Sequence, residues 1–257
     1  MKNLIIFLSV VMSSSISAQV TTVYNPITGE TWMDRNLGAT QIATSFDDVN
    51  AYGDLYQWGR NTDGHQIRTS STTSILSTTN SPNHSDFILA NSDWLTVSDD
   101  NLWQDVNGIN NPCPLGFRLP TEAELEAERL SWISNDAAGA FESPLKLTIG
   151  GARSRMSGAI GNVGTFVGYR TSDLNGLQSR MLGISLTTSL MGDRDRADGN
   201  CVRCIQDETA NSILEISNHK TLIKIVGILG RETNPKANTL LFYIYDDGTV
   251  QKKIILE

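Results

Sequence analysis

The chain has 257 residues, enough to bury a sizeable core in one large domain or two small ones. Apolar residues make up 39% and charged residues 19%, as in an ordinary globular protein. The net charge is −8 and no cluster of Lys and Arg is present. This argues against a nucleic-acid partner, because proteins that bind nucleic acids neutralise phosphates with clustered cations.

The first 18 residues have the features of a secretory signal peptide. Lys2 gives a positive start, residues 4–12 form an apolar stretch, and small residues follow. We expect cleavage between Ala18 and Gln19. The apolar stretch is shorter than the roughly 20 residues that cross a bilayer, and no later run approaches that length, so no transmembrane segment is expected. Removing Lys2 takes the net charge from −8 to −9, and export would place the cysteines in an oxidising environment.

The chain after the signal peptide begins with short strands, turns and loops. Pro26 and Gly29 supply a turn before a strand that runs through Trp32. The stretch DLYQWGRNTDGHQ, residues 54–66, predicts a second aromatic strand that ends in polar loop residues. Residues 69–86 are mostly Ser, Thr, Asn, Pro and His without an apolar period, which predicts a long surface loop.

The clearest helix begins after Pro120. Thr121 and Glu124 have the spacing of a capping box, and apolar residues then recur at helical spacing. This predicts one main helix over residues 121–134. Residues 145–203 are rich in Gly and break into short apolar pieces, which predicts an antiparallel sheet.

The last fifty residues differ from the rest. Residues 208–212 are expected to form a linker, and two strongly β-forming runs follow. Asp247 and Gly248 stand between two apolar strands, which is a hairpin signal. We therefore divide the chain into a signal peptide (1–18), a main domain (19–207), and a linker with a small all-β module (208–257).

Five stretches of the main domain, taken in order, carry a family resemblance. They are GETWMDRNLG (29–38), YGDLYQWGR (52–60), NPCPLGFRLPTEAEL (111–125), GYRTS (168–172) and RADGNCVRCIQD (196–207). With these stretches the main domain resembles the Fibrobacter succinogenes major paralogous domain family. The resemblance implies an α+β, loop-rich, C-type-lectin-like fold, related also to formylglycine-generating enzymes, with a twisted antiparallel sheet and few helices. Cys201 departs from the family pattern, which usually has a small or hydroxyl residue there.

The C-terminal module resembles a second family. GILGRE (227–232) and LLFYIYDDGTVQKKIILE (240–257) are similar to the type A C-terminal sorting domain of type IX secretion in Bacteroidota. The resemblance implies passage through the periplasm and recognition of residues 211–257 by the type IX secretion machinery. It also implies removal of this module on release or surface attachment.

Cys201 and Cys204 have the C-x-x-C spacing of redox and metal sites. In a strand their Cα atoms would lie about 10 Å apart, beyond the roughly 7 Å that a disulfide tolerates. Zinc takes about four ligands, and the chain has one other Cys and three scattered His. We favour a disulfide between Cys113 and Cys204 that ties the helix entrance to the last strand of the domain. A bridge from Cys113 to Cys201, reduced thiols and a metal site are the alternatives.

The acidic stretch DRDRADGN, residues 193–200, superficially resembles a calcium loop. An EF-hand that began at Asp193 would need Glu at its twelfth position, where Cys204 stands. We expect a solvated turn whose carboxylates pair with its own arginines, and no metal or other cofactor. A looser, lectin-type calcium site that uses Asp193, Asp195 or Asp198 is the alternative.

Large aromatic residues could pack in the core or stack on sugars. Trp32, Trp58 and Trp132 lie in strand or helix contexts, which predicts burial. Trp94 and Trp103 lie in a polar segment, so we expect them to be partly exposed. They are the first candidates for ligand contacts.

The arginines of the matching stretches are expected to be structural. Arg35, Arg60, Arg118 and Arg203 lie beside aromatic or apolar residues, which favours ion pairs or cation–π contacts with buried stems. The sequence has no Gly-x-Ser-x-Gly elbow, His-Glu-x-x-His motif or phosphate loop. GNCVRC does not reproduce the active-site cysteines of formylglycine-generating enzymes. We therefore do not expect an enzyme.

Together these features predict a secreted or outer-membrane cell-surface protein that travels through the periplasm. Its main domain is expected to be a non-catalytic binding module for a glycan or another surface polymer. The alternative is a structural or adhesive surface spacer, and a polysaccharide-active or oxidative enzyme is less favoured. The ligand prediction depends on the lectin-like fold, and a fold does not determine a function.

Overall fold

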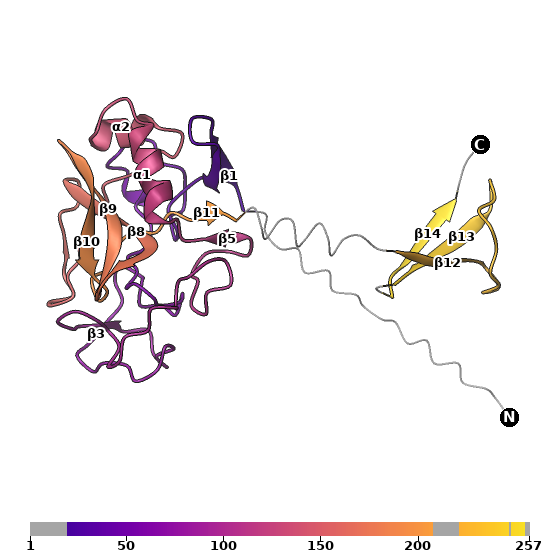
Figure 1. Cartoon of the computed structure of the whole chain (residues 1–257), viewed down its shortest axis with the longest axis horizontal. Helices are drawn as coiled ribbons and strands as arrows, with labels where there is room; N and C mark the ends of the chain where they lie inside the picture. Colours follow the sequence, from indigo (N-terminus) through magenta and orange to yellow (C-terminus); the bar gives the residue numbers. More distant parts are fainter. Residues whose placement is uncertain (1–19, 208–220, 247, 255–257) are drawn as a thin grey trace. The chain divides into compact units, whose positions relative to one another are not determined.

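The structure is a computed structural model, which describes residues 20–207, 221–246 and 248–254 (Figure 1). The expected signal peptide, its cleavage site at Ala18 and Gln19, and the expected linker lie outside these described residues. No helix within the described ranges is long and apolar enough to cross a membrane.

The chain divides into two compact units. Residues 118–206 and the chain before residue 115 form the first unit, which is here called the body together with residues 115–117 and 207. Residues 207–257 cluster with residues 115–117 in the second. The strands of this second unit that follow residue 220 are here called the tail. Each part is described by itself.

Short strands and two short helices, joined by long loops, make up the body. In chain order they are β1 (Thr22–Asn25), β2 (Glu30–Met33), a 3₁₀ turn η1 (Val49–Ala51), β3 (Thr72–Thr73), β4 (Phe87–Ile88), β5 (Phe117–Arg118), α1 (Glu122–Leu130), α2 (Ala137–Glu142), β6 (Ala152–Arg153), β7 (Ile160–Gly161), β8 (Phe166–Asn175), β9 (Gln178–Ser185), β10 (Ser189–Asp195) and β11 (Ile205–Gln206). The described part is mainly sheet with two α-helices, which agrees with the predicted α+β class.

Two sheets organise the body. The first has the strand order β1-β2-β11-β5, and its β1–β2 hairpin turns at Gly29, whose φ of 80° suits a residue without a side chain. The second is an antiparallel meander, β8-β9-β10, as the Gly-rich segment predicted. Helix α1 packs against all three strands of this meander, and α2 contacts β9 (Figure 1).

The main core fills the space between these elements. Trp32 of β2, Leu125 of α1 and Leu182 of β9 are among its fully buried members. Trp132 packs against this core while remaining partly exposed. The burial predicted for Trp32 and Trp58 is confirmed, because both are 0% exposed.

Helix α1 begins as predicted and ends earlier. Thr121 Oγ1 accepts from the Glu124 N–H at 3.2 Å, and Glu124 Oε2 accepts from the Thr121 N–H at 2.7 Å, so the capping box is formed. The prediction that the helix continues to residue 134 is wrong, because it ends at Leu130. Asp136 then caps a second helix, α2, by accepting from the Gly139 N–H at 3.0 Å. Capping by this short polar side chain starts a new helix direction.

The aromatic strand predicted over residues 54–66 is mostly absent. Within this range only Tyr56 pairs, in an isolated bridge to Asn200, and the rest is turn and loop. Gly59 has a φ of 84°, and an added Cβ there would lie 2.9 Å from Leu102 Cδ1. The chain turns at Gly59 to let Leu102 approach, so a strand cannot continue through this point.

Buried arginines hold the loops of the body. Five of them are at most 3% exposed: Arg60, Arg153, Arg170, Arg196 and Arg203. Arg203 donates to the carbonyl oxygens of Met33 at 3.2 Å and Leu145 at 2.7 Å. Its Nε and Nη2 both donate to Asn36 Oδ1, at 3.1 and 2.9 Å. Burial lowers the pKa of Arg203 to about 10, which leaves it charged at neutral pH.

The same arrangement recurs elsewhere in the body. Arg170 donates to the carbonyl oxygens of Asp195 at 2.9 Å and Asp198 at 2.6 Å, and Arg153 donates to that of Ser70 at 2.6 Å. Loop carbonyls have no strand or helix partner, and leaving them buried without a donor is costly. The guanidinium groups therefore supply the donors that regular secondary structure would otherwise provide.

The tail is a three-stranded antiparallel sheet. Its strands are β12 (Leu222–Gly227), β13 (Leu240–Tyr245) and β14 (Val250–Ile254), in that order. β13 and β14 pair on either side of the predicted hairpin turn, whose residue Asp247 lies outside the described residues. Gly248 donates its N–H to the Tyr245 carbonyl at 3.1 Å and has a φ of 77°.

We expect Arg203→Met to lower the free energy of unfolding by about 3 kcal/mol, because it leaves buried carbonyl oxygens without donors. Arg129→Met is the matched control, since Arg129 is partly exposed and bonds to the side chains of Glu126 at 2.6 Å and Asn135 at 2.5 Å and not to buried carbonyls. This variant should cost less than about 1 kcal/mol. Chemical denaturation of both variants measures the difference. Equal losses would contradict the role given to Arg203.

Candidate functional site

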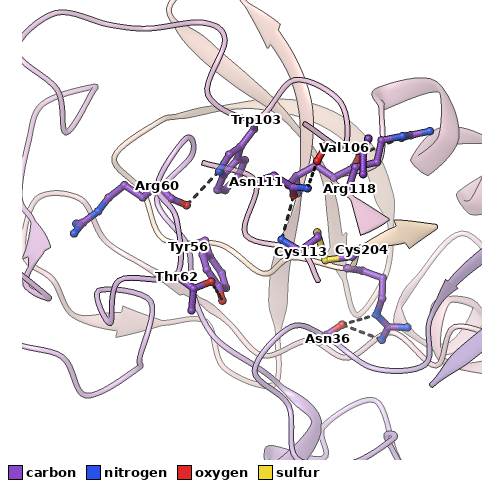
Figure 2. Close-up of a disulfide and its surroundings, with 12 residues drawn as sticks. Asn36, Tyr56, Arg60, Thr62, Trp103, Val106, Asn111, Cys113, Arg118 and Cys204 are labelled. Carbon is purple, nitrogen blue, oxygen red and sulfur yellow. Dashed lines mark hydrogen bonds between the residues drawn. A yellow bond between two sulfur atoms is a disulfide. The ribbon is translucent and has the colours of Figure 1, made fainter. Parts of the chain in front are cut away.

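A disulfide closes the body. Cys113 and Cys204 are bridged with their Cα atoms 5.9 Å apart, which confirms the favoured pairing (Figure 2). Asn111 fixes one side, because its Oδ1 accepts from the Cys113 N–H at 3.1 Å and its Nδ2 donates to the Val106 carbonyl at 3.1 Å. Arg203 holds the other side through Asn36. The bridge spans 91 residues, and closing a loop of that length stabilises the fold by roughly 4 kcal/mol in the chain-entropy model.

Cys201 is the free thiol of the chain. It is 0% exposed, and its Sγ lies 3.5 Å from the Tyr52 carbonyl oxygen. Burial raises the pKa of the Cys201 thiol to about 11. The thiolate is the nucleophilic form, so Cys201 has neither the ionisation nor the access that thiol chemistry needs.

His65 is equally enclosed. Its Nδ1 lies 2.6 Å from Asp63 Oδ1, and its Nε2 accepts from the Gln57 N–H at 3.1 Å. These partners fix the neutral imidazole with its proton on Nδ1, and burial lowers the pKa of His65 to about 4. The ring is 0% exposed, so it braces a loop and is not placed to exchange protons with a ligand.

The predicted exposure of Trp94 and Trp103 is wrong. Both side chains are 0% exposed, and the candidate ligand contacts they supplied are withdrawn. Trp94 Nε1 donates to the Trp58 carbonyl at 2.7 Å, and Trp103 Nε1 donates to the Arg60 carbonyl at 3.2 Å. The Arg60 guanidinium lies 5.5 Å from the centre of the Trp94 ring. The surrounding polar residues face solvent while the indoles turn inward, which composition alone does not reveal.

A hollow of about 540 Å³ lies between the loop segments 78–80 and 95–101, and we call it the loop depression. It is lined by Thr78, Asn80, Leu95, Val97, Ser98, Asp99, Asp100 and Asn101. Its volume is within the range of ordinary ligand pockets, roughly 300–1,000 Å³. Hydroxyl, amide and carboxylate groups line it beside two aliphatic side chains.

Main-chain and side-chain bonds fix the walls of the loop depression. Ser77 donates its N–H to the Trp94 carbonyl at 3.0 Å, and Thr96 donates to the Ser77 carbonyl at 2.9 Å. Asn110 Nδ2 donates to the carbonyls of Asn80 and Gly59, each at 2.7 Å. The walls are therefore held in place before any ligand arrives, which lowers the entropy cost of binding.

Arg196 contacts both acidic residues that line the loop depression, Asp99 and Asp100. It is 1% exposed, and its guanidinium lies 4.9 Å from the centre of the Trp58 ring. Its Nη2 lies 2.5 Å from Asp100 Oδ1, and its Nη1 donates to the Asp99 carbonyl at 3.3 Å. Arg196 also donates to the Leu177 carbonyl at 3.1 Å, in the turn between β8 and β9.

The prediction of a solvated turn over residues 193–200 is wrong, because residues 193–195 belong to β10 and residues 196–200 are buried. Its carboxylates pair with arginines as expected, but mainly with Arg180 and Arg155 of other segments and not with its own. Asp193 lies 2.6 Å from Arg180, and Arg155 lies 3.0 Å from Asp195 and 3.3 Å from Asp198. Within the described ranges, no group of three or more His, Cys, Asp or Glu is arranged to hold a metal ion.

The arginines of the matching stretches have structural partners. Arg35 pairs with Asp34 and Arg118 pairs with Glu124, each at 2.7 Å. The buried Arg203 instead uses neutral acceptors, as described above. None of these contacts leaves a guanidinium directed at the loop depression.

Comparison with protein-family models, curated proteins and solved structures found no match for the chain. The resemblances to the Fibrobacter succinogenes major paralogous domain and to the type IX sorting domain therefore stay predictions. The candidate site has to be argued from its own geometry.

We expect no reactive thiol in the native chain and one after unfolding without reductant, because two of the three cysteines are bridged and Cys201 is buried. Thiol titration with and without denaturant measures this. Cys201→Ala should remove the single thiol that unfolding exposes and leave the bridge intact. Two or more thiols titrated in the unreduced protein would contradict the pairing.

Proposed function

We propose that the body is a non-catalytic binding module of a secreted or cell-surface protein, and that the loop depression binds a glycan or another hydroxyl-rich polymer. The observation that carries this proposal is the depression itself, a preformed hollow of about 540 Å³ in the loop segment. Its polar groups match what sugar hydroxyls require, because amides, hydroxyls and carboxylates donate and accept in the same small space.

The walls also offer apolar contact. Leu95 and Val97 line the loop depression, and Val97 is 79% exposed. Sugar rings have C–H faces that pack on such side chains while their hydroxyls bond to the rim. An open hollow with both kinds of group suits one or a few units of a longer chain.

The cysteines and His65 of the body are not placed for catalysis. The thiol of Cys201 and the imidazole of His65 are fully buried, and Cys113 and Cys204 are oxidised. A general base or nucleophile must reach its substrate within hydrogen-bond distance. These groups are instead placed to stabilise the fold.

Blocking the hollow tests the proposal. Ser98→Trp places a large side chain in the loop depression, and it should abolish binding of any polysaccharide that the unchanged chain retains in a glycan-array or pull-down assay. Thr96→Trp is the matched control, because the Thr96 side chain is exposed beside the depression without lining it, and its bond to Ser77 is a main-chain bond that the variant keeps. If the unchanged chain retains no polymer, the proposal fails and a surface spacer becomes the better description.

We further propose that residues 211–257 direct export through the type IX secretion machinery. The support is the sequence resemblance and the formation by the tail of a sheet of its own. A handle of this kind can be recognised and cut without unfolding the body.

Deleting residues 211–257 should trap the protein in the periplasm, because the machinery would lose its signal while the body keeps its disulfide and core. Cell fractionation with antibody detection measures this. Normal surface delivery of the shortened chain would refute the export role and leave the binding proposal untouched.

A further inference from the structure

The two carboxylates of the loop depression are not equivalent. Asp100 pairs with Arg196, whose Nη2 lies 2.5 Å from Asp100 Oδ1 and whose Nη1 lies 3.8 Å from Asp93 Oδ2. Asp99 Oδ1 accepts from the main-chain N–H of Asn101 at 2.9 Å and from its side-chain amide at 3.4 Å, and both donors are uncharged. No Lys or Arg is among the lining residues. Asp99 is therefore the lining carboxylate that has no ion pair with a Lys or Arg among the described residues.

The body adds to this negative potential. Residues 19–207 contain 22 acidic and 13 basic side chains. Burial removes five side chains of each sign from solvent, namely the arginines described above and Asp34, Asp93, Glu128, Asp198 and Asp207. The excess of nine acidic side chains (22 minus 13) therefore persists on the solvent-facing surface. Such a surface attracts cations and repels anions, which disfavours phosphate- or sulfate-bearing polymers as ligands.

The remaining lining groups suit a sugar next to that charge. Thr78, Ser98 and Asn101 bring hydroxyl and amide groups for sugar hydroxyls, and Val97 offers an apolar surface for a ring face. A ligand that carries both hydroxyls and a positive charge would match the hydroxyl and amide groups of the lining and the carboxylate of Asp99.

We propose that the loop depression selects glycans that carry primary ammonium groups, with Asp99 as the counter-ion. This inference depends on the proposed function and specifies its ligand class. A charge-assisted hydrogen bond is roughly twice as strong as a neutral one. The ammonium group therefore gives discrimination that hydroxyls alone do not. Asp99 receives this role because, unlike Asp100, it has no cation of its own.

Two oligosaccharides of the same length and linkage test the selection. We compare a β-1,4-linked glucosamine oligomer with its fully N-acetylated counterpart, by calorimetric titration of the full chain at low ionic strength with the amines protonated. The glucosamine oligomer should bind at least about tenfold more tightly, and added salt should weaken it more than the acetylated oligomer.

Asp99→Asn should remove this advantage, because the amide keeps an acceptor for Asn101 and loses the charge. Asp105→Asn is the matched control, because Asp105 is an exposed carboxylate on the same loop that does not line the depression. It should keep the full preference. Thermal unfolding of both variants verifies that the fold is retained.

The outcomes separate the two proposals. Equal binding of the two oligomers, or a preference that survives Asp99→Asn, overturns the amine selection and leaves glycan binding in place. Binding of other glycans that Ser98→Trp abolishes, with neither oligomer bound, also overturns the selection alone. Failure to bind any glycan removes the proposed function and the selection with it.

Discussion

The body depends on guanidinium groups that donate to main-chain carbonyls in its interior. Arg153, Arg170 and Arg203 bind loop carbonyls that no strand or helix satisfies. A charge is expensive to bury, and this cost is tolerable only when nearly all of its donors find acceptors. Arginine meets that condition better than lysine, because its five donors lie in a fixed plane. Residues 20–207 contain twelve Arg and one Lys, which fits this use.

The same interaction connects the interior to the candidate site. Arg196 packs on the Trp58 ring and bonds to the rim of the loop depression and to the turn between β8 and β9. The lining residues lie in loops, but Arg196 connects them to the buried Trp58. Loops positioned by a rigid scaffold are where binding residues commonly occur.

The sequence predicts local features well and long-range ones poorly. The capping box at Thr121, the antiparallel meander and the pairing of β13 with β14 follow from short-range residue chemistry, and all three are present. The pairing of Cys113 with Cys204 was favoured among several alternatives and is present. The strand that was expected to separate Cys201 from Cys204 is absent, because β11 begins only at Ile205. The orientation of Trp94 and Trp103 could not be predicted, since it is set by carbonyls of the turn at residues 58–60. The loop depression could not be predicted for a similar reason. Its walls come from segments about twenty residues apart, and the main-chain bonds that join them leave no signal in the sequence.

The disulfide also bears on the order in which the protein can mature. A chain emerges from synthesis and from a membrane channel with its N-terminus first, and Cys204 follows its partner by 91 residues. The bridge can therefore form only after β8, β9 and β10 have emerged. Until then the loop that contains α1 is not covalently tied to β11. Covalent closure of the body is thus a late event, reserved for a nearly complete domain.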